Sequence, residues 1–569
     1  MYRPVRLVIR EPKSQSHLSN QHILHITTQR EELLTDTMPA TLPLELLSEI
    51  ASLLYEAGDC LVPYTTVCRR WQAAFEPFIY SDLIVYSDDA HKEESQKGIS
   101  LAHFQKATAG SGAIRQVWIR KLQYDILVPF ELLDWTTHKD EGYSVDNPVR
   151  EANDQAFQTA ITALFETLSS WNQSHRLSLE LGLLGRQMGE EPEPHTWDYE
   201  DAGEYRYDYR NGREMSVPPY RARFHNNDAS VLAYVPCVDK LSFTNEPSDG
   251  ESDLRHRFHQ IWAGAVAQIV QHCPTITHLH LNLDEWVRPD HIEVNCNKLY
   301  AFLVDNSPGV SELFNNAPRS LKVLNYSNQY EAPWKSALPA LNVLSTETDN
   351  FTINLRALST VLQELKLYNT SLSSDFLWPL DKAGRPLPNG GTLQWPNLTI
   401  IELNDVPPFL PSGMEYPLCS PPYTNHAFQT PGKWLALPTP EEQAGLDEPD
   451  EEISSPDDVI WDYDRGYASR KMVDDEEYHR FFTSMGHAAR HMPRLKSIKF
   501  HLEHSTRLNF SFQPDSDPIT AEWHSRAIPA YHPDERVAEA WGFPIEDFHF
   551  DPEEFDTVVN FDCWPPGDV

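Results

Sequence analysis

The chain has 569 residues, of which 40% are hydrophobic, and a formal net charge of −38 from 46 basic and 84 acidic side chains. This length predicts several domains or a repeat array, and the acidic balance argues against nucleic acid and anionic membranes as partners. Seven scattered cysteines without a Cys-x-x-Cys pair indicate free thiols in a reducing compartment, cytoplasmic or nuclear. The sequence also lacks an apolar run of the ~18 residues that a membrane span requires.

Residues 1–37 are predicted to be a disordered extension. The first thirty residues are rich in arginine and poor in acid, a bias that a mitochondrial presequence shares. Met38 follows the extension and offers an alternative start. The extension is the preferred interpretation because a helical segment with a distinctive residue order begins directly after it.

Residues 38–86 predict a pair of amphipathic helices. Thr41 is a candidate N-cap, and Pro43 falls near the first helical position, where a missing N–H costs nothing. The first apolar stripe contains Leu46, Leu47, Ile50, Leu53 and Leu54, and the second contains Tyr64, Val67, Trp71 and Phe75. Short helices of this kind are marginal alone and must bury their stripes. One interpretation is a plain helical hairpin that packs on the rest of the protein.

The residue order of this segment resembles the F-box. The family pattern is matched by Leu42, Pro43, Glu45, Leu46, Ile50, Leu53, Leu54, Leu61, Val67, Cys68, Arg69 and Trp71. The loop over residues 55–60 is longer than the common pattern. The resemblance implies docking to a Skp-family linker protein and, through it, to a cullin. The implied contact residues are Leu42, Pro43, Leu46, Ile50, Leu54, Leu61, Val67, Cys68 and Trp71.

A second pattern, hydrophobic-x-x-hydrophobic-x-hydrophobic, recurs through residues 87–406 and 478–520. Its copies begin at Ile114, Val238, Ile276, Leu321, Leu362, Leu398 and Leu495, with a weaker one at Leu341. The last two apolar positions alternate as in a strand, several copies follow a short turn with proline, and helices are expected over 152–171 and 257–271. The unit resembles a leucine-rich repeat with irregular spacing, which implies a degenerate solenoid. The alternative is a conventional α/β domain with buried strands.

The residue between the last two apolar positions of each copy is predicted to point away from the core. These residues are Trp118, Ser242, His280, Asn325, Ser345, Lys366, Glu402 and Lys499. Their mixed charge suits protein recognition, and we select Trp118, His280, Asn325, Lys366, Glu402 and Lys499 as a candidate substrate face. The alternative is an ordinary solvated face.

Three further segments complete the organisation. Residues 190–214 are rich in acid and tyrosine, and residues 407–477 are rich in acid and proline, which predicts solvated insertions. Residues 521–569 carry three tryptophans among acids and are predicted to cap the open end of the repeats.

The sequence shows no catalytic constellation. His278 and His280 share one side of a predicted strand but have no third ligand at fixed spacing, and no phosphate-binding glycine loop occurs. The predicted fold is α/β: a helical F-box followed by an irregular leucine-rich-repeat solenoid with acidic insertions. Such an architecture resembles fungal-type F-box proteins. It implies a non-enzymatic substrate adaptor of an SCF-type ubiquitin ligase, without a cofactor. The alternative is an interaction scaffold acting outside ubiquitylation.

Overall fold

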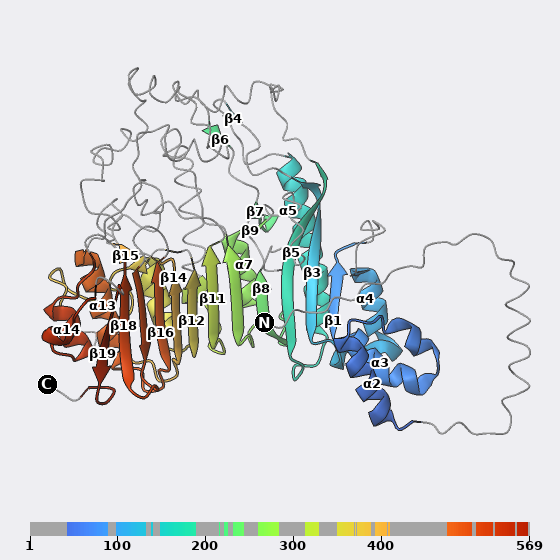
Figure 1. Ribbon diagram of the computed structural model, residues 1–569. Helices are drawn as coiled ribbons and strands as arrows, with labels where there is room; N and C mark the ends of the chain where they lie inside the picture. Colours follow the sequence, from blue (N-terminus) through green and yellow to red (C-terminus); the bar gives the residue numbers. More distant parts are fainter. Residues whose placement is uncertain are drawn as a thin grey trace, which may run out of the picture. The chain divides into compact units, whose positions relative to one another are not determined.

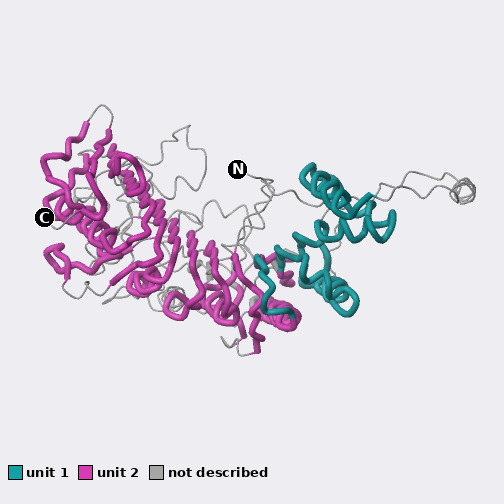
Figure 2. Tube along the Cα trace, turned by 90° about the horizontal axis from the view of Figure 1, so that it is seen from below, with its two compact units in different colours: residues 1–125, 171–180 teal, residues 126–170, 181–569 magenta. Residues whose placement is uncertain are grey.

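The computed structural model describes residues 42–88, 98–131, 138–139, 148–188, 215–216, 221–225, 231–243, 260–283, 313–328, 350–368, 370, 372–387, 393–406, 408–409, 475–502, 508–526, 530–551 and 555–566. The chain divides into two compact units (Figure 2). Unit 1 comprises residues 1–125 and 171–180, and unit 2 comprises residues 126–170 and 181–569. The predicted extension 1–37, the insertion 190–214 and the residues of the second insertion before 475, except 408–409, lie outside the described residues.

Unit 1 begins with a helical hairpin. Its elements are α2 (Leu44–Glu56), the 3₁₀ helix η1 (Val62–Thr66) and α3 (Arg69–Ile79). The second predicted stripe therefore spans two short helices, because Cys68 is extended, with a φ of −165°, and separates them. The hydroxyls of Thr65 and Thr66 donate to the carbonyls of Val62 and Pro63, and these bonds hold η1 as a local turn.

The remainder of unit 1 contains β1 (Asp82–Tyr86), β2 (Ile99–Ser100), α4 (Leu101–Thr108), η2 (Gly110–Val117) and the start of β3 (Lys121–Glu131). Strand β1 pairs in parallel with β2 and β3. The pattern copy that begins at Ile114 was expected to be a strand, and this expectation is wrong: Ile114 and Val117 lie in η2, and Ile119 follows η2 before β3 begins. Gly112 allows this tight turn, because a Cβ there would lie 2.1 Å from the carbonyl oxygen of Ala107.

The largest sheet has thirteen strands and is mostly parallel (Figure 1). Its consecutive parallel strands in unit 2 include β8 (Val238–Phe243), β10 (His278–Leu283), β11 (Val323–Asn328), β12 (Glu364–Tyr368), β14 (Ile400–Asn404) and β16 (Ser497–Leu502). Strand β5 (Leu177–Met188) precedes β8 in this order. Strands β17 (Leu508–Gln513), β18 (Ile519–Ser525) and β19 (Asp556–Phe561) continue it in antiparallel pairs.

The six parallel strands from β8 to β16 coincide with six copies of the recurring pattern, so these strand predictions are confirmed. Before four of them the same backbone turn occurs, in which the first apolar residue donates its N–H to the carbonyl three residues earlier. These residues are Ile276, Leu321, Leu362 and Leu495, at 3.0–3.3 Å. Each is at most 4% exposed. The first apolar position thus closes a turn, and the next two fill the buried face of the strand.

Helices connect the strands of unit 2. They are α5 (Pro148–Ser169), α7 (Ala263–Gln271), α10 (Asn350–Ser359), α13 (Asp475–Ala489), α14 (Glu535–Trp541) and the 3₁₀ helix η9 (Ile545–Asp547). The helix predicted over 152–171 is present as α5. The helix predicted over 257–271 is confirmed only as α7, because Gln260–Ile261 form strand β9 instead and residues 257–259 lie outside the described residues. The described residues also form three short strand pairs: β4 (His138–Lys139) with β6 (Met215–Ser216), β7 (Arg221–Ala222) with β9 (Gln260–Ile261), and β13 (Leu372–Ser373) with β15 (Pro408–Phe409).

The C-terminal part of unit 2 has an aromatic core. The rings of Phe510, Trp523 and Trp541 lie within 4.7–6.4 Å of one another, measured between centroids, and Trp523 and Trp541 are buried. The fold as described is mixed α/β with a large, mostly parallel sheet. No helix in the described part of the chain is long and apolar enough to cross a membrane.

Candidate docking surfaces

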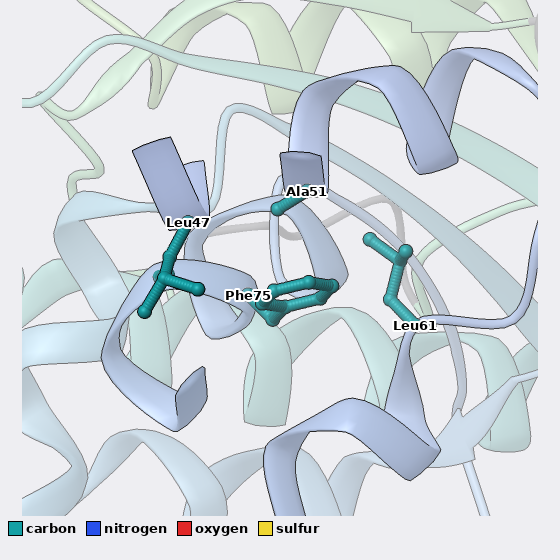
Figure 3. Close-up of a cluster of buried hydrophobic side chains, with 5 residues drawn as sticks. Leu47, Ala51, Leu61 and Phe75 are labelled. Carbon is teal, nitrogen blue, oxygen red and sulfur yellow. The ribbon is translucent and has the colours of Figure 1, made fainter. Parts of the chain in front are cut away.

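The helical hairpin of unit 1 has a small core of its own. Leu47 and Ala51 from α2, Leu61 from the loop, and Ala74 and Phe75 from α3 are each at most 2% exposed (Figure 3). The Phe75 ring lies 5.2 Å, centroid to centroid, from both Tyr64 and Trp71. The hairpin therefore has an interior that fixes which side of each helix faces outward.

Large apolar side chains remain on the outside of this hairpin. Among the described residues sixteen large hydrophobic side chains are exposed, and six of these fall between Leu42 and Val67: Leu42, Leu44, Leu46, Leu53, Val62 and Val67. Leu46 and Leu53 are seven residues apart and so lie on one side of α2, with half-buried Ile50 between them. This concentration exceeds the scattered exposed hydrophobics expected on an ordinary surface.

The nine predicted contact residues divide into three groups. Leu42, Pro43, Leu46, Val67 and Cys68 are exposed. Ile50, Leu54 and Trp71 are half-buried against the core. Leu61 is fully buried. The exposed Leu44, Leu53 and Val62 were not predicted as contact residues. Leu53 could have been predicted from the sequence, because it lies seven residues after Leu46 and so on the same side of the helix.

Helix η2 is fixed to α3 by a basic side chain. The Arg115 guanidinium pairs with the Glu76 carboxylate at 3.0 Å and lies 5.0 Å from the centroid of the Tyr80 ring. Burial raises the pKa of Tyr80. The predicted placement of Trp118 on a strand is wrong, because this residue follows η2 as a turn, half-buried, with its ring 6.4 Å from Tyr80. It does not belong to the outward row of unit 2.

The other predicted outward residues form one row in unit 2. Across the parallel sheet the paired positions run Ser242, His280, Asn325, Lys366, Glu402 and Lys499. The sequence spacing between these residues ranges from 36 to 97, yet they are brought side by side. Their apolar neighbours in the chain are buried, whereas the row itself is half-buried or exposed. Ser345 lies outside the described residues.

The row combines paired charges with uncharged polar groups. Lys366 Nζ lies 3.3 Å from Glu402 Oε2 and 3.9 Å from Glu364 Oε2. Beside His280, the amide oxygens of Asn325 and of Asn282 are buried, and no hydrogen-bond partner is found for either in the described structure. Buried acceptors of this kind are costly unless a donor reaches them. The row therefore presents paired charge at its surface, above two buried amide oxygens for which the described structure shows no donor.

His278 and His280 lie on the outward-facing side of β10. Burial lowers the pKa of His278. Within the described ranges, no group of three or more His, Cys, Asp or Glu residues is placed to hold a metal ion. The five described cysteines are free thiols. Comparison of the chain with family models, with curated proteins and with solved structures found no match.

Proposed function

We propose that this protein is a substrate adaptor of a cullin-based ubiquitin ligase, in which the helical hairpin is an F-box that docks to a Skp-family linker. The observation that carries the proposal is the exposed apolar set on a hairpin that already has its own core. The exposed side chains are not needed to hold α2 and α3 together, so a partner surface is the physical reason for them. The residue order of this segment resembles that of the F-box.

The second half of the proposal concerns the parallel strands from β8 to β16. We assign them to a degenerate leucine-rich-repeat solenoid, supported by the same backbone turn before four of the six strands and by the shared register of the pattern. The row from Ser242 to Lys499 would hold a protein substrate, and the adaptor would act by proximity, bringing a substrate lysine close to a charged ubiquitin carrier. The adaptor itself would carry out no bond chemistry.

Linker binding is tested with the full chain and a purified Skp-family linker. The double substitution Leu46→Asp with Leu53→Asp places two charges in the apolar set and is expected to abolish co-purification. Ile353→Asp is the matched control, because Ile353 on α10 is 44% exposed and Leu46 is 45% exposed. The control is expected to retain binding. Absence of binding by the unmodified chain at micromolar concentration would refute the docking assignment.

Substrate turnover distinguishes the adaptor from a scaffold. Partners captured through the row should be ubiquitylated in the presence of the complex and should accumulate when the gene is deleted. Linker binding together with unchanged ubiquitylation and half-life of every captured partner would favour a scaffold acting outside ubiquitylation.

A further inference from the structure

Strand β19 forms one edge of the large sheet, and among the described strands it pairs with β18, while its first residue, Asp556, also forms an isolated bridge with Asp551. An edge strand presents unpaired N–H and C=O groups to any further strand that can reach them. The free groups of β19 can be identified from its register. The register pairs Asp556 with His524, so the preceding residue, Phe555, is opposite Ser525. The Ser525 N–H donates to the Phe555 carbonyl at 2.8 Å.

Hydrogen-bonded pairs in an antiparallel ladder occur at every second residue. Thr557, Val559 and Phe561 therefore direct their backbone groups toward β18. Asp556, Val558 and Asn560 direct theirs outward. The Asp556 carbonyl confirms this direction, because it accepts an N–H from Asp551, outside the β18–β19 pair, at 3.1 Å. Within the described structure no backbone partner is found for Val558 or Asn560.

The edge has a regular pattern of burial. Thr557, Val559 and Phe561 are buried, while Val558 is 47% exposed and Asn560 is exposed. Such alternation fixes the register of an added strand, since a shift by one residue would exchange the two faces. The edge is therefore a short, ordered template with one exposed apolar side chain.

The charge around this edge indicates what would pair with it. Asp556 and Asp562 lie at the two ends of the strand, and Glu522 is opposite Val558 on β18. None of the three takes part in an ion pair in the described structure. Arg526 lies over the Phe555 ring, at the end that Asp551 already covers. An added strand with basic residues would meet complementary charge, and acidic residues in it would be repelled.

One two-fold pairing of β19 with a second copy of this chain is unfavourable. In a two-fold pair with Val558 opposite the second copy's Asn560, each Asp556 would be opposite an Asp562. Like charges directly opposite each other destabilise a strand pair. We propose that β19 is a docking site for an extended, lysine- or arginine-containing segment of another protein, which adds to the sheet through the backbone of Val558 and Asn560.

The test uses the full chain and a short fluorescent peptide of alternating threonine and valine with lysine at both ends. Fluorescence anisotropy should show binding that weakens as salt is raised. The same peptide with terminal glutamates should not bind, and methylation of its alternate backbone nitrogens should abolish binding. Failure of the lysine peptide to bind at millimolar concentration would overturn the proposal and leave the acidic residues as protection against strand pairing.

Two sets of variants locate the site. Val558→Pro removes an outward N–H without removing a ladder hydrogen bond to β18, so the affinity should fall about tenfold while the unfolding midpoint is retained. Asp556→Asn with Asp562→Asn should reduce affinity for the lysine peptide and flatten its salt dependence. Unchanged affinity in both sets would refute the assignment. A dimer of the unmodified chain that Val558→Pro dissociates would instead identify a second copy as the occupant.

Discussion

The division of the helical hairpin into core and surface can be tested with one pair of substitutions, Phe75→Ala and Leu53→Ala. Phe75 is fully buried and its ring lies 5.2 Å from the rings of both Tyr64 and Trp71. Removing a buried phenylalanine ring costs about 3–5 kcal/mol from lost burial and the cavity that remains. Leu53 is 62% exposed, and its removal should cost within about 0.5 kcal/mol.

Hydrogen exchange measured by mass spectrometry is the suitable assay, because a protein of two compact units has no single unfolding free energy. A loss of 3–5 kcal/mol corresponds to a fall of roughly two to three and a half powers of ten in exchange protection, at 1.4 kcal/mol for each factor of ten. Phe75→Ala should therefore bring α2 and α3 close to unprotected exchange. Strand β12 in unit 2 is the internal control.

Leu53→Ala should leave exchange in α2 and α3 unchanged, and under the proposed function it should weaken binding of a Skp-family linker. The opposite result would refute the division: if Leu53→Ala raises exchange throughout the hairpin and Phe75→Ala does not, the exposed set is part of the interior. Equal effects of both substitutions on exchange would also refute the division. A fully buried side chain should stabilise the hairpin far more than a mostly exposed one.

Three further predictions concern charge. Arg536, which pairs with Glu476, holds the pKa of that carboxyl below its ordinary 4.5. Because the Glu476 side chain is half exposed, water screens the pair, so loss of this pair in Arg536→Ala should cost about 0.5–1 kcal/mol near neutrality. Denaturant titrations should show this difference shrinking as the pH falls through the lowered pKa. Burial lowers the pKa of His487 to about 4, so the hydrogen-exchange protection factors of α13 should decrease as the pH is lowered from 6.5 to 4, and they should decrease less in His487→Gln. A double-mutant cycle on Lys366 and Glu402 should give a coupling free energy of about 0.5–1 kcal/mol for the stability of unit 2, and added salt should reduce this coupling.

The parallel strands of unit 2 were predictable from the sequence because the pattern reflects two physical requirements: a buried residue that closes a turn, and a strand with one buried face. In the copy over 321–326, Leu321 closes a turn and Leu324 and Tyr326 fill one face of a strand. The residue between them, Asn325, must then point the other way. The same logic in each copy is why the row from Ser242 to Lys499 could be predicted without knowing which strands pair.

The copy at Ile114 shows the limit of this pattern. Apolar residues at i, i+3 and i+5 also fit the side of a short helical turn, and here Gly110 and Gly112 favour the turn. Gly110 adopts a positive φ of 54°, and Arg115 donates to the Ala107 carbonyl at 3.1 Å. Both features depend on neighbours that the three apolar positions do not reveal, so the strand expected there, and Trp118 with it, was misplaced.

The contact residues of the hairpin could be only partly predicted, because helix α2 is apolar over more of its circumference than its own core uses. At about 100° per residue, Leu47 and Leu54 lie within about 20° of each other and face the core. Leu46 and Leu53 lie roughly 100–120° away from Leu47 and remain exposed. Both groups look alike in the sequence, as leucines at helical spacing. Only the position of α3 determines which group is interior, and the apolar arc left over then becomes the physical reason to expect a partner.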